Sequence, residues 1–215
     1  MPFGYIGQNQ TKQKVKNSGV LSSFEISHLE KQCHAGGSLE LIDTISFSSG
    51  VSTVSATNLQ EDKYDVHLIH WKNFEITTSG GGTCQTNFQL AENGTFTTSG
   101  YQRAVQGANA GGSDFEGKST SDSRIFNAYS TGNGNNINFS VYMYLYNAGD
   151  SSKYTFATCH SSSVNGATQY GFEFGSGVLP QASLVNGIRI IENNRVGAGN
   201  ANISGTASLY GIAES

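Results

Sequence analysis

The stretch Ile137-Asn138-Phe139-Ser140-Val141-Tyr142-Met143-Tyr144-Leu145-Tyr146 decides the fold class. Its odd positions carry large apolar side chains, whereas its even positions carry Asn, Ser and three tyrosines. Because successive side chains of a β-strand point to opposite faces of the sheet, this period of two predicts a strand with one face on the core. The same period begins near Ser38 and returns through the rest of the chain. The sequence therefore predicts an all-β protein.

The composition of the 215-residue chain points the same way. Charged residues make up 13% of the sequence, against about 25% in an average globular domain. There are 27 glycines and only 2 prolines, and aromatic residues reach 11%. These proportions suit short strands joined by tight turns, and they exclude a helical bundle, a coiled coil and a disordered chain.

Alternation in other segments predicts further strands. The longest covers Tyr64 to Ile76, and apolar residues on both of its faces suggest a central strand between two layers. We expect Ile69 and Trp71 on one face of it, and the remaining apolar residues on the other: Tyr64, Val66, Leu68, Phe74 and Ile76. Glu92-Asn93-Gly94-Thr95 is the strongest hairpin signal, because Asn-Gly tolerates the positive φ angles of a type I′ turn.

These segments amount to roughly eight to ten strands without the βαβ alternation of a parallel sheet. We therefore expect an antiparallel β-sandwich, jelly-roll-like, over residues 37–215. Residues 107–121 and 130–136 are poor in apolar side chains and are expected to form long surface loops.

Residues 1–36 differ from the rest and are expected to form an extended N-terminal docking arm with one short helix. Within it, residues 8–17 are polar and basic and have no alternating apolar face, so the opening stretch 1–21 is either a solvated tail or a segment that orders on a partner, which we prefer. Ser22 and Glu25 fit a capping box that starts a helix over residues 23–32. The expected docking residues are Phe3, Tyr5, Ile6, Lys12, Lys14 and Lys16.

The formal charge of −4 provides no general attraction to nucleic acid or anionic lipid. No apolar run approaches the ~20 residues of a membrane-spanning helix, and the first residues lack the pattern of a signal peptide. The three cysteines, an odd number and far apart, do not form a disulfide framework. We expect reduced thiols in a protein made in a cytoplasm, with neither nucleic acid nor membrane as partner.

Motifs for metals, cofactors and nucleophilic catalysis are weak. His67-x-x-His70 and the adjacent pair Cys159-His160 place their side chains on opposite faces of a straight strand, so neither pair can chelate one ion there. No nucleophile elbow or phosphate-binding loop is present. The sequence predicts no metal site, no cofactor and no catalytic residue.

Paired carboxylates for glycoside hydrolysis cannot be recognised from spacing alone. Five acidic residues lie in or beside expected strands: Asp43, Asp65, Glu75, Glu173 and Glu192. Glu173, flanked by Phe172 and Phe174, is the single candidate for a raised pKa, but we expect it to face solvent while its two neighbours face the core. A depolymerase is therefore kept only as a third hypothesis, and the prediction is that the protein is not an enzyme.

Tyr142, Tyr144 and Tyr146 lie on the face of their strand opposite Val141, Met143 and Leu145. Tyrosine offers apolar area, a stacking face and a hydroxyl group. Three explanations remain open for this row: a second layer within the chain, an interface between subunits, or a platform for sugar rings.

The order of several sequence blocks resembles that of virion structural proteins of tailed bacteriophages. The opening residues 1–20 carry the resemblance first. Later blocks follow in the same order over nearly the whole chain: residues 60–66, 92–94 with 99–101, 144–147 with 151–154, 186–189 and 205–212. Cys84 and His160 depart from the pattern, and no function rests on them.

The resemblance implies a non-enzymatic structural protein located in the virion and synthesised in the host cytoplasm. The arm would dock to other virion proteins, of the capsid or the tail, with Lys12, Lys14 and Lys16 facing an acidic surface. Family analogy also implies a homo-oligomer, with a trimer preferred. The protein would be a capsid decoration protein or a short tail-fibre component, and the alternative is an adhesin that recognises host surface polysaccharide.

Overall fold

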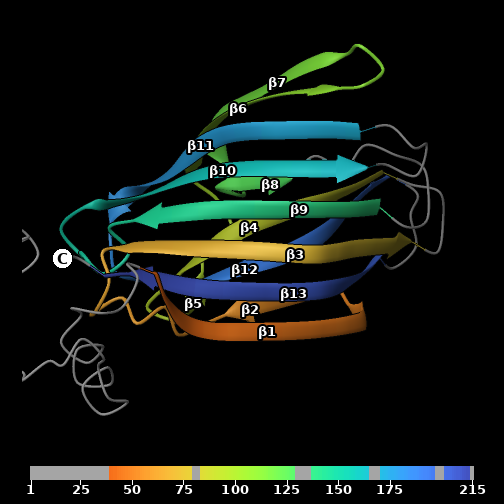
Figure 1. Ribbon diagram of the computed structural model, residues 1–215. Coiled ribbons are helices and arrows are strands. Elements are labelled where there is room, and N and C mark those ends of the chain that lie inside the picture. The colour runs from red at the N-terminus through yellow and green to blue at the C-terminus, as the bar shows by residue number, and fades with distance from the viewer. Residues whose placement is uncertain (1–38, 79–82, 129–136, 165–169, 197–200, 214–215) are drawn as a thin grey trace, which may run out of the picture. The chain divides into compact units, whose positions relative to one another are not determined.

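The computed structural model describes residues 39–78, 83–128, 137–164, 170–196 and 201–213, and these residues form only strands and the turns that join them (Figure 1). The all-β prediction is confirmed for this part of the chain. The expected helix, the arm and the boundary between residues 36 and 37 lie outside the described residues. The strands are β1 (Leu39–Val51), β2 (Thr53–Ala56), β3 (Val66–Thr78), β4 (Thr83–Glu92), β5 (Thr95–Phe96), β6 (Tyr101–Asn109), β7 (Asp114–Asp122), β8 (Phe126–Ala128), β9 (Ile137–Tyr146), β10 (Tyr154–Val164), β11 (Tyr170–Ala182), β12 (Val185–Val196) and β13 (Ala201–Ile212).

The strands form two antiparallel sheets, as in a β-sandwich. The first has eight strands in the order β1-β13-β3-β9-β10-β11-β6-β7, and it faces the reader in Figure 1. The second has the order β2-β12-β4-β5, and β8 also pairs with β4. More strands are present than the sequence predicted, because β2, β5 and β8 have only 4, 2 and 3 residues and are too short to show a period of two.

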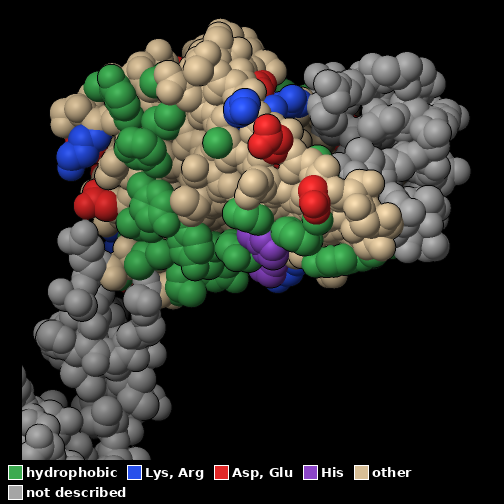
Figure 2. All heavy atoms as spheres, turned by 90° about the horizontal axis from the view of Figure 1, so that it is seen from above, with side chains coloured by type: hydrophobic (Ala, Val, Ile, Leu, Met, Phe, Trp, Pro, Cys, Tyr) green, Lys and Arg blue, Asp and Glu red, His purple; other side chains and the backbone are tan. Residues whose placement is uncertain are grey.

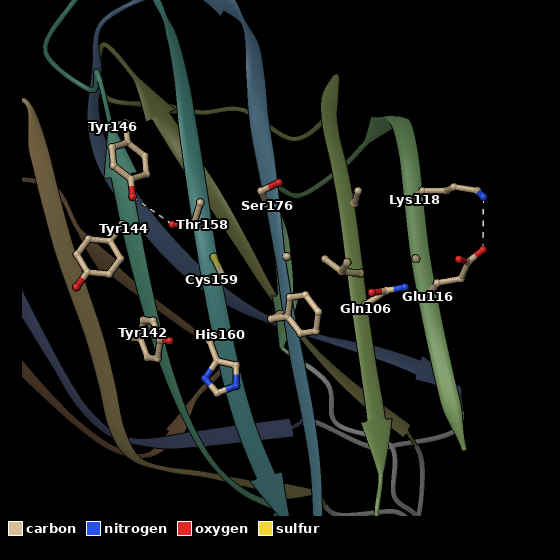
Figure 3. Close-up of a pocket in the computed structure, with 15 residues that line it drawn as sticks. Gln106, Glu116, Lys118, Tyr142, Tyr144, Tyr146, Thr158, Cys159, His160 and Ser176 are labelled. Atoms are coloured by element: carbon tan, nitrogen blue, oxygen red, sulfur yellow. Dashed lines mark hydrogen bonds and ion pairs between the residues drawn. The ribbon is translucent and has the colours of Figure 1, made fainter. Parts of the chain in front are cut away.

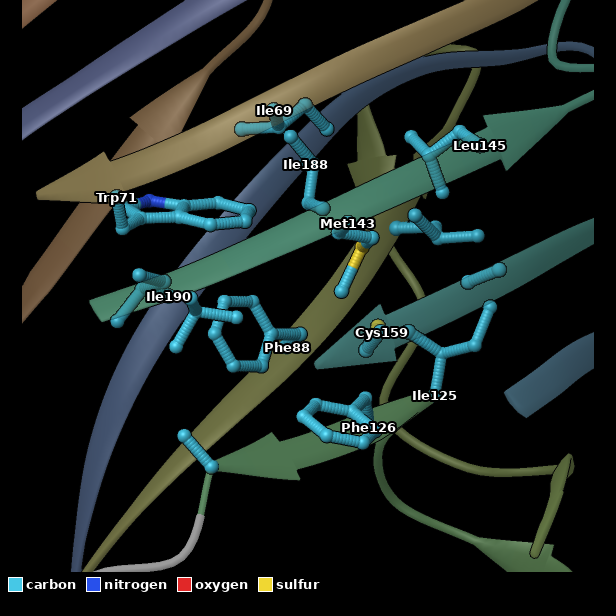
Figure 4. Packing of buried hydrophobic residues seen from close by; sticks show 14 of the residues in the cluster. Ile69, Trp71, Phe88, Ile125, Phe126, Met143, Leu145, Cys159, Ile188 and Ile190 are labelled. Atoms are coloured by element: carbon cyan, nitrogen blue, oxygen red, sulfur yellow. The ribbon is translucent and has the colours of Figure 1, made fainter. Parts of the chain in front are cut away.

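The core lies between the two sheets. Trp71 of β3 packs against Phe88 of β4, with ring centroids 4.7 Å apart. Val141, Met143 and Leu145 are buried, as the alternation in β9 predicts. Figure 4 shows Met143 and Leu145 of the eight-stranded sheet facing side chains of the other sheet, which include Ile188, Ile190 and Phe126. We call the opposite side of the eight-stranded sheet, which turns away from this core, the outer face.

The predicted faces of β3 were wrong in their second half. Ile69, Trp71, Phe74 and Ile76 are all buried, so they share the inner face. The reason is a register shift between Trp71 and Phe74 in the pairing with β9, where Asn73 adopts a φ of 51°. An extra residue in one strand reverses the alternation that follows it.

The hairpin prediction is confirmed. β4 ends at Glu92 and β5 begins at Thr95, and the two turn residues have φ angles of 49° (Asn93) and 82° (Gly94). Positive φ at both central positions is the signature of the type I′ turn.

The expected loop over residues 107–121 is instead the hairpin of β6 and β7, while residues 130–136 lie outside the described residues. Gly107 pairs with Phe115, and a Cβ atom on that glycine would lie 2.1 Å from a ring carbon of Phe115. A glycine is needed because the ring occupies the space of the missing side chain. This close approach removes the apolar alternation that would have revealed the strand.

Candidate functional site

The outer face of the eight-stranded sheet carries an unusual number of exposed rings. Tyr142, Tyr154, Phe156, Tyr170 and Phe174 each leave between 45% and 48% of their surface exposed. Figure 2 shows hydrophobic side chains gathered along one margin of the molecule with a histidine among them. Large apolar patches are uncommon on soluble proteins and usually mark a binding surface.

The tyrosines of β9 lie as the sequence predicts, on the face opposite the buried aliphatic row. The rings of Tyr142 and Tyr144 meet edge to face with centroids 6.3 Å apart, and those of Tyr144 and Tyr146 stack at 6.5 Å. The Tyr146 hydroxyl also lies 3.4 Å from Oγ1 of Thr158 on β10. These contacts fix the three rings as one row along β9.

Further rings continue across the sheet. His160 of β10 lies with its ring centroid 5.3 Å from that of Tyr142 and 6.5 Å from that of Phe172 on β11. Phe172 and Phe174 are nearly parallel, with an interplanar angle of 8°. The aromatic surface therefore spans three neighbouring strands.

Two hollows on this face share one floor. The first, of about 830 Å³, extends from the tyrosine row of β9 to Glu116 and Lys118 of β7 (Figure 3). The second, of about 790 Å³, lies beside it and is lined by Phe156 and Val178. Both hollows contain the same four floor residues: Thr158, Ser176, Ala104 and Lys118. We call this combined depression the trough.

The floor of the trough follows the register of the sheet. Thr158 of β10 pairs with Ser176 of β11, and Ser176 pairs with Ala104 of β6. Ala104 in turn pairs with Lys118 of β7. The small side chains of Thr158, Ser176 and Ala104 thus lie at a single level on three successive strands, and Lys118 ends this level on β7. The neighbouring levels on β10 and β11 carry the larger side chains of Phe156 and Val178 on one side and of His160 and Phe174 on the other.

The charges that line the trough balance. Lys118 and Glu116 form an ion pair at 3.4 Å at the far end of the trough, and their side chains are 80% and 68% exposed. The other side chains that line either hollow include no carboxylate, and Arg103 is paired with Asp122 at 2.6 Å. The lining therefore offers hydroxyl, amide and aromatic groups with no dominant charge.

The histidine and cysteine candidates lie as strand alternation requires. His67 is buried on the inner side, where its Nε2 lies 2.8 Å from the carbonyl oxygen of Leu59, whereas His70 lies on the outer face beside Ser140. Cys159 is buried, and burial followed by the Glu173 carboxylate raises the pKa of its thiol well above the usual range. Its thiol therefore stays protonated near neutral pH and faces the core, away from His160.

No three His, Cys, Asp or Glu side chains of the described ranges come together as a metal site would require. Over the same ranges we find no helix of the length and apolar character needed to cross a lipid bilayer.

The expected orientation of Glu173 was wrong. Its side chain is 1% exposed and points into the core, while Phe174 points outward. Glu192 is also buried on the inner side, where its Oε2 accepts a hydrogen bond of 3.1 Å from the Thr86 hydroxyl. Asp43 and Asp65 are exposed on other parts of the surface.

The docking residues proposed for the arm, Phe3, Tyr5, Ile6, Lys12, Lys14 and Lys16, lie outside the described residues. The structure does bring Tyr142, Tyr144 and Tyr146 together at one end of the trough. The floor residues, and the walls formed by Phe156 and Phe174, were not predicted from the sequence. The available signal for the wall was the alternation in the first half of β10, where the rings of Tyr154 and Phe156 point outward and the small Ala157 points inward.

Comparison with known proteins does not assign the chain to a family. No protein-family model matches the chain, and no curated protein is significantly similar to it.

Proposed function

We propose that this chain is a non-enzymatic surface protein of a bacteriophage virion, and that its sandwich-like domain attaches the particle to host polysaccharide. The observation that carries the attachment role is the trough on the outer face, with its aromatic walls, small polar floor and balanced charge. A sugar ring has an apolar face that stacks on aromatic rings and a rim of hydroxyl groups that bonds to polar side chains.

Binding without hydrolysis is supported by the groups that line the trough. Hydrolysis of a glycosidic bond normally uses two carboxyl groups placed about 5–10 Å apart on either side of the bond. Among the described residues that line the trough, the only carboxylate is Glu116, which is exposed and paired with Lys118.

The virion assignment rests on the resemblance of the ordered sequence blocks to virion structural proteins, and it is compatible with a fold of two antiparallel sheets. With it we propose a jelly-roll relationship, a homo-oligomer that is a trimer by analogy, and docking through residues 1–36. The position is that of a capsid decoration protein or a short tail-fibre component.

The attachment role is tested by retention on immobilised bacterial surface polysaccharides. We expect the wild-type protein to be retained, and the Tyr142→Ala and Tyr144→Ala variants to be retained less while a cooperative thermal transition shows that they still fold. The attachment role would be contradicted if none of the immobilised polysaccharides retained the protein and both tyrosines were buried between subunits of an oligomer.

The virion role is tested separately by deletion of residues 2–20. We expect a soluble, folded domain that no longer joins particles. Normal incorporation of the truncated protein would show that the opening segment is a passive tail. Immunogold labelling of intact particles would then distinguish the head from the tail.

A further inference from the structure

We propose that the trough binds a single unbranched, uncharged polysaccharide chain that lies across the strands, from Tyr144 of β9 to Lys118 of β7. This inference rests on the proposed function, because it specifies the direction, the chemistry and the contacts of the polysaccharide.

The floor sets the direction of the bound chain. Tyr144, Thr158, Ser176, Ala104 and Lys118 lie at one level on five successive strands, as the register of each pairing shows. Four spacings between neighbouring strands give a path of about 19 Å. Figure 3 shows Thr158 and Ser176 between the tyrosine row on one side and Lys118 on the other. An extended chain could follow this path over the small side chains of Thr158, Ser176 and Ala104.

The walls exclude the other direction. Phe156 and Val178 pair with each other at the level on one side of the floor, and His160 and Phe174 pair at the level on the other side. The two levels are four residues apart, which separates their Cα atoms by about 14 Å. A ligand running along a strand would have to cross one of these walls, whereas a chain running across the strands passes between them. A branch that runs along the strands would meet a wall, so an unbranched chain fits the floor better than a branched one.

The side chains that line the trough indicate the chemical class of the ligand. Phe156 and Phe174 offer exposed apolar faces, while Thr158, Ser176 and Gln106 offer polar groups between or beside them. A single-stranded nucleic acid also stacks on rings, but it needs a positively charged groove. Here the ammonium group of Lys118 is balanced by Glu116. An uncharged sugar chain is therefore the ligand that suits both the rings and the charge.

The test is native affinity electrophoresis of the full chain in gels that contain one polymer each. The polymers are amylose, an unbranched β-1,3-glucan and an unbranched β-1,4-mannan, with alginate as the anionic polymer and a branched α-mannan for comparison. The blocking variant is Ser176→Trp, which fills the floor. The matched control is Ser162→Trp, because Ser162 lies on the outer face of β10 but lines neither hollow of the trough.

We expect at least one unbranched, uncharged polymer to retard the wild type, Ser176→Trp to weaken its apparent affinity at least tenfold, and Ser162→Trp to leave it within twofold. Thermal melting checks that each variant is folded. If Ser176→Trp does not fold, Ala104→Gln on β6 takes its place, and the same loss is expected because Ala104 lies on the same floor.

The other outcomes contradict the attachment role, the trough as the binding site, or the chemistry of the ligand. Retardation of the wild type by no polymer overturns the proposed attachment role itself. Retardation that Ser176→Trp and Ser162→Trp leave equally unchanged overturns the trough while the attachment role stands. Equal retardation by alginate or the branched mannan overturns the chemistry of the ligand. If no polymer binds and sedimentation shows that Ser176→Trp dissociates an oligomer, the face is an interface between copies of the chain.

Discussion

Replacing Phe174 with Ala removes one wall of the trough, and its effect on polysaccharide binding follows from the exposed area of the ring. Phe174 is 48% exposed, and a Phe side chain of about 200 Å² would then leave about 95 Å² for a ligand. At about 25 cal/mol per Å², full coverage of that area contributes about 2.4 kcal/mol. A sugar ring stacked on one face covers about half of it, so we expect a loss of about 1.2 kcal/mol, or about sevenfold in Kd.

The matched control for this substitution is Tyr154→Ala. Tyr154 lies on the same outer face and is 47% exposed, but it lines neither hollow of the trough. Both substitutions remove a similar buried area, so both should lower the melting temperature by a similar amount. Isothermal titration with the best-retarding polymer gives the two Kd values. A Phe174→Ala Kd within twofold of the wild-type value, or an equal loss in Tyr154→Ala, would refute the assignment of the ring to the ligand.

Three further predictions concern the stability of the fold. Tyr101→Phe should cost about 1–3 kcal/mol in chemical denaturation, because the buried Tyr101 hydroxyl accepts a 2.8 Å hydrogen bond from a backbone N–H of β4; an unchanged denaturation midpoint would contradict this. Stability should fall as the pH drops below about 6.5, because burial lowers the pKa of His67 in the folded state, so the unfolded chain takes up the proton first; a His67→Gln variant with the same slope between pH 6.5 and 5 would show another cause. Gly177→Ala should cost about 1–3 kcal/mol in free energy of unfolding, because a Cβ atom there would lie 2.1 Å from the Ile125 carbonyl oxygen; wild-type stability in thermal melting would contradict that steric reason.

Local signals in the sequence predicted the parts of the fold that depend on few residues. The Asn93-Gly94 turn and the alternation over β9 each follow from the conformational preferences of neighbouring residues, and both are confirmed. The register shift after Trp71 in β3 could not be predicted in this way. It depends on Asn73 adopting a positive φ against the partner strand β9, and a reversal of alternation leaves no local mark when apolar residues occur on both faces.

The prediction that the Glu173 side chain faces solvent was wrong, and the reason lies outside its own strand. Two phenylalanines around a glutamate ordinarily predict that the rings are buried and the carboxylate is exposed. In the structure Glu173 shares the inner face of β11 with Gly177, where the segment that leads into β8 approaches so closely that the Ile125 carbonyl oxygen leaves no room for a Cβ atom. The sequence of β11 alone does not contain that neighbour, so the tyrosine end of the site could be predicted and the phenylalanine wall could not.

The close approach of Ile125 explains why the inner position 177 is a glycine, but it does not explain why outer positions of β10 and β11 carry rings. Moving a Phe side chain from water into a core is worth about 1.5–3 kcal/mol, and Phe156 and Phe174 each forgo about half of that. Small polar residues would fill outward positions of the same strands without leaving apolar area in water, as Thr158 does between them. On β10 and β11 the paired hydroxyl residues Thr158 and Ser176 lie between the level of Phe156 and the level of Phe174. The exposed parts of these two rings contribute nothing to the packing of the two sheets. The pattern is accounted for once a ligand covers the rings and meets the hydroxyl group between them, which is the arrangement that the trough offers.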